Sequence, residues 1–227
     1  MLQKVFFKDL GIQPYKKVWD YQEKLLKENT AKKFNGDGNT IHHLLFVQHL
    51  PVYTLGKSGH EENILISNAE MKINGIEYFR TNRGGDITFH GLQQIVGYPI
   101  LDLDKFKTDL SWYLRSLEEV IILMLAEYGL QGERSKGETG VWINANVKGK
   151  ERKICAMGIR CSRWVTMHGF ALNVNTNLKY FDDIIPCGIQ NKQVTSLQKE
   201  LGAEVDYEDA KQKLKRNFEK VFDVELI

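Results

Sequence analysis

The stretch Arg-Gly-Gly-Asp-Ile-Thr-Phe-His-Gly, residues 83–91, is the most informative part of this 227-residue chain. Two adjacent glycines precede a short run of β-branched and aromatic residues, which predicts a loop leading into a strand. Glycine lets a backbone approach a ligand closely because it has no Cβ. Arg83 adds a fixed positive charge and His90 a titratable group. The stretch therefore predicts a loop that contacts a small ligand, although a double glycine also occurs in plain turns and Arg83 alone would suit an exposed surface.

The segments around this loop predict strands and helices that interleave without a regular βαβ repeat. Strands are expected at residues 43–48, 141–143, 154–161 and 164–174, and helices at residues 15–27, 110–128 and 207–222. A turn at residues 148–150 makes a hairpin of the second and third strands. The pattern predicts an α/β fold of the α+β-like kind, a mixed sheet with packed helices in a single domain over residues 1–227.

Capping residues mark several of the predicted helix boundaries. Thr108 or Asp109 suits the start of the helix at residues 110–128, and Gly129 suits its end. Thr195 and Gln198 have the spacing of a capping box, which predicts a short helix ending at Gly202.

Composition and charge exclude several classes of function. Lysine and arginine number 31 against 29 aspartates and glutamates, so no basic excess indicates a nucleic-acid partner. No apolar run approaches the roughly 18 residues of a membrane span. No CxxC, HExxH, GxGxxG or GxxxxGK[ST] spacing occurs, so neither a metal nor another cofactor is predicted.

The three cysteines favour a reducing, cytoplasmic location, because their number is odd and no signal peptide is recognisable. Cys155 and Cys161 fall in one predicted strand, roughly 20 Å apart, which is too far for a disulfide.

Cys187 and Lys153 are the candidate catalytic residues. Pro186 and Gly188 flank Cys187 and predict a turn that exposes the thiol, whose reactive form is the thiolate. Lys153 opens a predicted strand and would supply a cation that favours the thiolate. The alternatives are a buried cysteine acting as a small hydrophobe and a solvated lysine. His49 and His168 are possible supporting residues, or simply hydrogen-bonded core histidines.

Taken together, these motifs resemble those of the lipoyl(octanoyl) transferases. The resemblance rests on residues 83–91, Tyr98-Pro99, Gly140-Val141-Trp142, residues 164–174, Pro186-Cys187-Gly188-Ile189 and the His-Leu-Pro-Val-Tyr-Thr-Leu-Gly run at residues 49–56. They occur in family order from about His49 to Thr195. The resemblance implies a fold similar to that of biotin and lipoate ligases.

The resemblance also implies an activity, partners and site residues. An octanoyl group would pass from octanoyl-acyl carrier protein, through a thioester on Cys187, to a lysine of a lipoyl domain. That domain would belong to a 2-oxoacid dehydrogenase complex or to the H protein of glycine cleavage. Lys153 falls on the lysine thought to tune the cysteine. The implied substrate-binding residues are Arg83, Gly84, Gly85, Asp86, Ile87, Thr88, Phe89, His90, Ala156, Met157, Gly158, Gly169, Phe170 and Ala171.

One departure and one charge cluster bear on substrate binding. After Gly91 the family commonly continues Pro-Gly-Gln, whereas this chain has Leu92-Gln93-Gln94, which changes the stiffness of the loop. Basic residues gather in sequence between Lys148 and Arg163, and they form either a face for an acidic carrier or a solvated surface.

Two rival functions remain open. An ATP-dependent lipoate or biotin ligase of similar fold would activate a free acid and need no cysteine. A non-catalytic module that binds an acyl carrier would lack acyl-enzyme formation, and the joint presence of Cys187 and Lys153 argues against it.

Overall fold

The computed structural model describes residues 2–185 and 193–227. Its centre is an eight-stranded mixed sheet in the order β10-β8-β9-β6-β2-β1-β11, with β7 also paired to β8. The strands are β1 (Gln3–Gln13), β2 (His42–His49), β6 (Gln94–Ile100), β7 (Val141–Ile143), β8 (Arg152–Ser162), β9 (Val165–Asn173), β10 (Gln193–Val194) and β11 (Val224–Leu226). The predicted mixed sheet is confirmed, as is the β7–β8 hairpin.

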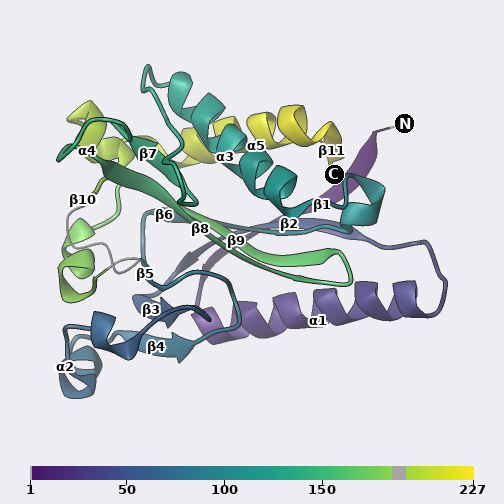
Figure 1. Cartoon of the computed structure of the whole chain (residues 1–227), viewed down its shortest axis with the longest axis horizontal. Coiled ribbons are helices and arrows are strands. Elements are labelled where there is room, and N and C mark those ends of the chain that lie inside the picture. Colours follow the sequence, from purple (N-terminus) through teal and green to yellow (C-terminus); the bar gives the residue numbers. More distant parts are fainter. Residues whose placement is uncertain (1, 186–192) are drawn as a thin grey trace.

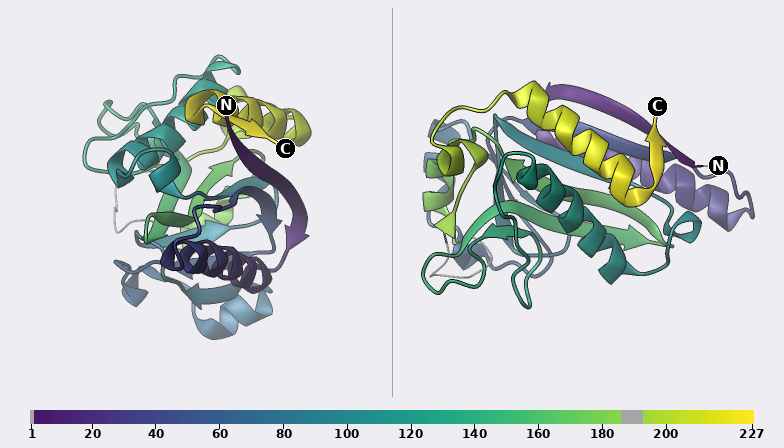
Figure 2. Two further views of the ribbon diagram at one scale, coloured as in Figure 1. Left: turned by 90° about the vertical axis from the view of Figure 1, so that its right-hand side faces the viewer. Right: turned by 90° about the horizontal axis from the view of Figure 1, so that it is seen from above.

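Helices cover both faces of this sheet (Figure 1). Helix α1 (Tyr15–Phe34) lies on one face, and α3 (Leu110–Ala126) and α5 (Tyr207–Phe222) lie side by side on the other, as Figure 2 shows from above. The α3–α5 side holds the largest apolar cluster, which includes Leu117, Ile121 and Phe218. A second cluster joins Val18 and Leu26 of α1 to the other face.

A small second sheet lies on the same side as α1 (Figure 1). Its strands are β4 (Glu77–Arg80), β3 (Val52–Leu55) and β5 (Ile87–His90), in that order. The remaining short elements are α2 (Asn68–Ile73), α4 (Leu197–Leu201) and the 3₁₀ turns η1 (Glu61–Asn63), η2 (Leu103–Lys105) and η3 (Leu178–Asp183). This sheet builds its own apolar cluster with the η3 segment, and β5 extends directly from the glycine loop.

The predicted start of α3 and both bounds of α5 are confirmed, whereas the predicted capping box before α4 and the predicted end of α1 are wrong. Helix α5 has the predicted bounds, and Asp109 caps α3 by accepting a hydrogen bond from the Trp112 N–H at 3.0 Å. The predicted capping box at Thr195 is not formed, because Ser196 caps α4 and accepts from the Lys199 N–H at 3.2 Å. The Thr195 hydroxyl donates to Glu200 instead.

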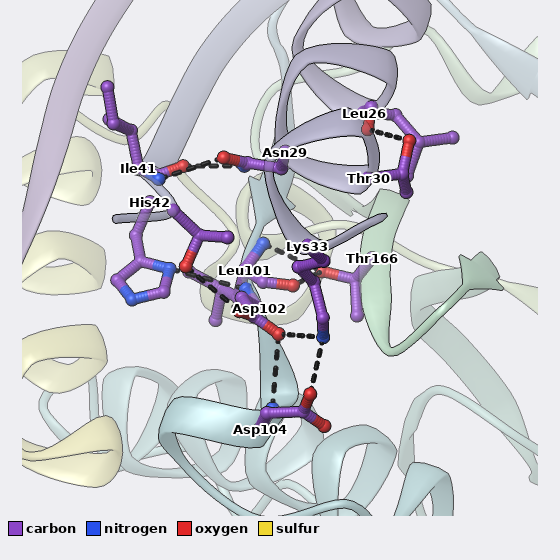
Figure 3. Close-up of polar contacts among 11 residues, drawn as sticks. Leu26, Asn29, Thr30, Lys33, Ile41, His42, Leu101, Asp102, Asp104 and Thr166 are labelled. Atoms are coloured by element: carbon purple, nitrogen blue, oxygen red, sulfur yellow. Dashed lines mark hydrogen bonds and ion pairs between the residues drawn. The ribbon is translucent and has the colours of Figure 1, made fainter. Parts of the chain in front are cut away.

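Helix α1 runs to Phe34, seven residues beyond the predicted end. Tertiary contacts hold these last turns (Figure 3). The Asn29 amide donates to the Ile41 carbonyl at 2.7 Å, and Lys33 Nζ lies 2.5 Å from Asp102 and 2.6 Å from Asp104. The Asp102 N–H in turn donates to His42 Nδ1 at 3.2 Å. This polar cluster ties the end of α1 to the segment that leads into α3.

Candidate active site

A cavity lies between the glycine loop, the start of α1 and the adjoining strands β5, β6, β8 and β9. The space between its walls, with the open mouth included, amounts to about 800 Å³. Its lining comprises Tyr15, Arg83, Gly85, Asp86, Ile87, Thr88, His90, Gln94, Val96, Tyr98, Thr139, Lys153, Ala156, Met157, Gly158, His168, Gly169, Phe170, Ala171, Asn173, Phe181 and Val194. Segments that are far apart in the sequence therefore line the same cavity.

Backbone contacts hold the glycine loop over β8. The Gly84 N–H donates to the carbonyl of Ile159 at 2.8 Å, and the Ser58 N–H donates to the carbonyl of Gly85 at 3.2 Å. Gly85 has a φ of +84°, a conformation that glycine adopts without strain. A Cβ on Gly158 would lie 2.6 Å from the Gly84 carbonyl oxygen, so the loop can approach β8 only because residue 158 is glycine.

The Arg83 side chain shapes this loop from within. It is 7% exposed, and its guanidinium donates to the carbonyls of Thr54, Gly84 and Asp86. A planar fork of donors can bind several fixed acceptors at once, which a lysine cannot do. The surface alternative for Arg83 is therefore wrong. The guanidinium ties the glycine loop to β3 and leaves a buried positive charge beside the cavity.

Asp86 fixes the other end of the loop. One carboxylate oxygen accepts from the Ile87 N–H at 2.7 Å, and the other accepts from the Asn63 amide at 2.7 Å. These bonds fasten the exit of the loop to η1 as it enters β5.

His49 and Tyr98 form a buried hydrogen-bonded pair behind the cavity wall. His49 Nδ1 donates to the Gln13 carbonyl at 3.0 Å, so Nε2 accepts from the Tyr98 hydroxyl at 2.8 Å. Burial lowers the pKa of His49 to about 4, which keeps the ring neutral at pH 7. His49 is not itself a lining residue, but its hydrogen-bond partner Tyr98 and its ring neighbours Tyr15 and His90 all line the cavity.

His90 lines the cavity directly and is also neutral. Its Nδ1 donates to the Gln94 side-chain oxygen at 3.0 Å, because the Gln94 amide nitrogen donates elsewhere, to Phe89 and Asn173. Its Nε2 lies 3.4 Å from the Thr54 hydroxyl, which serves as the donor. Burial, with the positive charge of Arg83 nearby, holds the pKa of His90 well below its usual value.

His168 also lines the cavity, and its backbone has a φ of +58° within β9. In a regular strand its side chain would share a face with Phe170, which packs in the α3–α5 core. Instead the ring lies 6.5 Å from that of Trp19 in α1, and Nε2 donates to the Asn82 side-chain oxygen at 2.7 Å. The left-handed backbone turns this histidine to the α1 side of the sheet.

Lys153 lies at the opposite end of the cavity from His168. Its Nζ is 4.6 Å from the centre of the Trp142 ring, and Val194 of β10 pairs with it in register. Cys187 lies outside the described residues. The described chain before it ends at Ile185, whose N–H donates to the Asn63 carbonyl at 2.8 Å, and the chain resumes at β10 beside Lys153.

The structure brings together most of the residues implied by the family resemblance. Gly84 and Phe89 are the two substrate-binding candidates absent from the lining. Gly84 is the backbone link to β8, while Phe89 points into the small-sheet core and stacks on Tyr180 at 4.5 Å. Sequence patterns missed Tyr15, Gln94 and Asn173 as lining residues. The sequence feature that could have indicated Gln94 is its polar side chain in an otherwise apolar strand.

The basic residues between Lys148 and Arg163 do not form one face. Lys148 precedes β8 and Arg163 follows it, so the eleven residues of that strand separate the two by more than about 30 Å. Arg160 pairs with Glu23 at 2.6 Å, and Arg152 pairs with Glu200 at 2.7 Å. The idea of a continuous basic docking face is therefore wrong.

The backbone of Gln93 shows how this chain can have Leu92-Gln93 where the family commonly has Pro-Gly. It has a φ of +60°, a conformation suited to the glycine that the family commonly has there. Its carbonyl accepts hydrogen bonds from the backbone N–H groups of Val174 and Asn175 and from the Thr176 hydroxyl. These bonds hold the left-handed turn without glycine.

A glycine loop closing a partly apolar cavity, with a lysine at its far end, defines an enzyme of the lipoyl ligase and transferase class. Residues 14–219 match the lipoyl protein ligase A/B catalytic domain, and the chain belongs to that family. It is 56% identical to an octanoyltransferase of Christiangramia forsetii, covering 100% of this chain and 99% of that protein. It is 53% identical to an octanoyltransferase of Flavobacterium johnsoniae, with full coverage of both.

Solved structures agree on the fold. A bipartite lipoate protein ligase of Thermoplasma acidophilum superposes with a TM-score of 0.72 at 17% identity, covering 100% of this chain and 86% of the other. A biotin protein ligase of Aquifex aeolicus gives a TM-score of 0.51 at 13% identity, covering 98% and 70%. The expected similarity to lipoate and biotin ligases is confirmed. Among the described residues, no helix combines the length and apolar character needed to cross a membrane.

Proposed function

We propose that this protein is an octanoyltransferase that moves an octanoyl group from a carrier thioester to a lysine of a lipoyl domain. The observation that carries the proposal is the cavity, which gathers twelve of the fourteen expected substrate-binding residues together with Lys153. The near full-length identity to octanoyltransferases supports the same activity. Residues 1–227 act as one catalytic domain, because both sheets contribute to the cavity wall.

Cys187 is the proposed nucleophile. Its thiolate attacks the carbonyl carbon of the donor thioester, and the bond from that carbon to the carrier sulfur breaks. The carrier sulfur then takes up the proton that the Cys187 thiol lost on ionising, so the carrier leaves as a thiol. This exchange of one thioester for another is nearly isoenergetic. The amine of the acceptor lysine then attacks the enzyme thioester, the amide bond forms, and Cys187 leaves with a proton taken from the amine.

Lys153 favours the thiolate of Cys187 and assists the proton transfer from the incoming amine. The return of the chain to β8 at Val194, in register with Lys153, supports this pairing because it holds one end of the segment containing Cys187 beside the lysine. Backbone N–H groups of residues 156–158 or near Gly188 supply the oxyanion site in this proposal.

The cavity binds the acyl chain. Ile87, Val96 and Ala171 provide apolar surface along it. Each buried CH₂ contributes about 0.8 kcal/mol, so binding rises with chain length as far as the cavity extends. The donor is octanoyl-acyl carrier protein, and the acceptor is a lipoyl domain of a 2-oxoacid dehydrogenase complex or the glycine cleavage H protein. The reaction takes place in the cytoplasm.

An intact mass spectrum tests this function. The protein is mixed with octanoyl-acyl carrier protein, without ATP, beside Cys187→Ser, Cys155→Ser and Cys161→Ser. An octanoyl adduct is expected on the wild type and on both control variants, and none on Cys187→Ser. Modification that appears only with ATP and free octanoate would instead identify a ligase. Carrier binding without an adduct would identify a binding module.

A further inference from the structure

Asn173, the last residue of β9, connects the cavity wall to the strand beside Lys153. Its side-chain nitrogen donates to the Thr195 carbonyl at 3.0 Å. The Thr195 N–H in turn donates to the Lys153 carbonyl, also at 3.0 Å. Asn173 is buried and lines the cavity, so this link runs from β9 to the end of β10 inside the site.

Side-chain hydrogen bonds continue from Asn173 back to the glycine loop. The Gln94 amide nitrogen donates to Asn173 Oδ1 at 2.8 Å, and His90 Nδ1 donates to the Gln94 side-chain oxygen at 3.0 Å. The Thr54 hydroxyl lies 3.4 Å from His90 Nε2 and accepts from the Arg83 guanidinium at 3.0 Å. This polar network therefore joins the glycine loop to β3, β5, β6 and β9.

Two backbone carbonyls fix the direction of the bonds in this polar network. A carbonyl oxygen only accepts, so the Gln94 atom that contacts the Phe89 carbonyl is its nitrogen. The same holds for the Asn173 atom that contacts the Thr195 carbonyl. The two amide oxygens therefore accept, from His90 and from Gln94. Every bond donates toward Thr195, and hydrogen bonds aligned in this way strengthen one another.

Strand β10 depends on such a link because it has only two residues, fewer than strands usually have. Val194 of β10 and Trp142 of β7 both pair with Lys153, so the lysine backbone lies between these two strands. Glu200 holds the hydroxyl of Thr195, and the polar network holds its carbonyl. The placement of β10 therefore fixes one side of Lys153.

We propose that Asn173, oriented by Gln94, is a positioning residue that holds Lys153 in place relative to the glycine loop. The inference rests on the proposed octanoyl transfer, in which Lys153 assists the proton transfer from the acceptor amine. A displacement of about 1 Å at a catalytic group can lower a rate about a hundredfold. Loss of the link leaves the acyl-binding wall intact but displaces the lysine, so it lowers kcat and leaves KM unchanged.

Asn173→Asp tests this role in the transfer assay. The carboxylate keeps the shape and the acceptor for Gln94, but it places a second acceptor against the Thr195 carbonyl. We expect kcat to fall at least about tenfold, with the KM for octanoyl-acyl carrier protein unchanged. Asn175→Asp is the matched control, because the Asn175 amide donates to the Val205 carbonyl at 2.8 Å and does not line the cavity. It should keep the wild-type kcat. A wild-type kcat in Asn173→Asp would overturn the proposal.

A double-mutant cycle with Lys153→Ala separates positioning from a general structural role. If Asn173 acts through the lysine, Asn173→Asp should cause no further loss of rate in the Lys153→Ala protein. Single-turnover transfer, followed by intact mass spectrometry, gives the four rates. An equal fold loss in both backgrounds would mean that Asn173 acts independently of Lys153, which contradicts the proposal.

Amide hydrogen exchange at Thr195 tests the link without any substrate. We would compare the wild type with Asn173→Asp and with Gln94→Met, which removes the donor that orients Asn173 and serves if the first variant does not fold. Exchange should be about fivefold faster in both variants and unchanged in Asn175→Asp. Wild-type exchange in the variants would overturn the link even if octanoyl transfer is found. Faster exchange in a protein that forms no octanoyl adduct would support the link and contradict only the proposed function.

Discussion

Gly84 and Ile159 join the glycine loop to the large sheet through one backbone hydrogen bond of 2.8 Å. The bond connects the segment that begins at Arg83 to the strand that carries Lys153, so the two sides of the cavity are held at a fixed separation. Gly158, next to Ile159, makes this approach possible because it presents no side chain to the loop. The position of the glycine loop over β8 therefore depends on a backbone contact that a side chain at residue 158 would obstruct.

Gly158→Ala should open the loop. The added Cβ would lie 2.6 Å from the Gly84 carbonyl oxygen and 3.3 Å from the Arg83 side chain. We expect a loss of about 1–3 kcal/mol in the free energy of unfolding, by analogy with overpacked cores, and at least a tenfold fall in kcat/KM. Urea unfolding and the transfer assay measure the two effects. Gly38→Ala, whose nearest neighbour would be Lys105 Nζ at 3.7 Å, serves as the control. Wild-type kinetics for Gly158→Ala would show that the loop does not need this contact.

Local patterns predicted the helices well because each signal lies within the helix itself. Asp109, Gly129 and the apolar stripe between them define α3 without help from the rest of the chain. The last turns of α1 were missed because Asn29 and Lys33 are polar, and their contribution comes from residues far along the chain such as Asp102. The strand β1 was also missed. Its pairing with β2 and with the C-terminal β11 is non-local, and Val5 is its one buried residue.

The residues of the candidate site also fall into two groups, those that local sequence patterns predict and those whose position depends on distant parts of the chain. Arg83 and His90 were predictable because the glycines beside them mark a ligand loop. Tyr15 begins the helix predicted at residues 15–27, but its position in the cavity depends on where α1 meets the sheets. The side-chain direction of His168 could not be predicted either, because alternation along a strand assigns it to the opposite face and its φ of +58° reverses that assignment.

Gln93 offers a test of the left-handed turn after Gly91. Gln93→Ala keeps a Cβ at φ +60° but loses the 2.9 Å hydrogen bond that the Gln93 side chain accepts from Asn175. It should destabilise the protein by about 1 kcal/mol. Gln93→Gly loses the same bond but relieves about 1 kcal/mol of strain, so its stability should be near that of the wild type. Thermal unfolding of both variants measures these two changes in stability. A glycine variant less stable than the alanine variant would contradict the strain argument.

His42 should make the protein less stable in mild acid. Burial lowers its pKa from 6.5 to about 4, and its Nδ1 accepts from the Asp102 N–H in the cluster of Figure 3. Between these pH values the unfolded chain binds a proton that the folded protein excludes. Stability is therefore fully present above pH 6.5 and decreases by up to about 3 kcal/mol as the pH falls to 4.

Urea unfolding between pH 7 and pH 4 measures this effect. His42→Gln should have a shallower dependence of the unfolding free energy on pH than the wild type. Burial also lowers the pKa values of four other histidines, which contribute to the remaining slope in both proteins: His43, His49, His90 and His168. His60→Gln replaces an exposed histidine and should keep the wild-type slope. Equal slopes in all three proteins would mean that His42 is protonated in the folded state.

Lys153→Ala should shift the alkylation of Cys187 to higher pH. Without the cation, a smaller fraction of the thiol is ionised at neutral pH, and alkylation requires the thiolate. Lys153→Arg keeps the charge and should retain most of the wild-type reactivity. Iodoacetamide labelling from pH 6 to 10, read at the Cys187 peptide, gives the midpoint for each protein. Burial raises the pKa of both Cys155 and Cys161, so these thiols should label slowly and serve as internal references. An unchanged midpoint in Lys153→Ala would restrict Lys153 to the proton transfer from the acceptor amine.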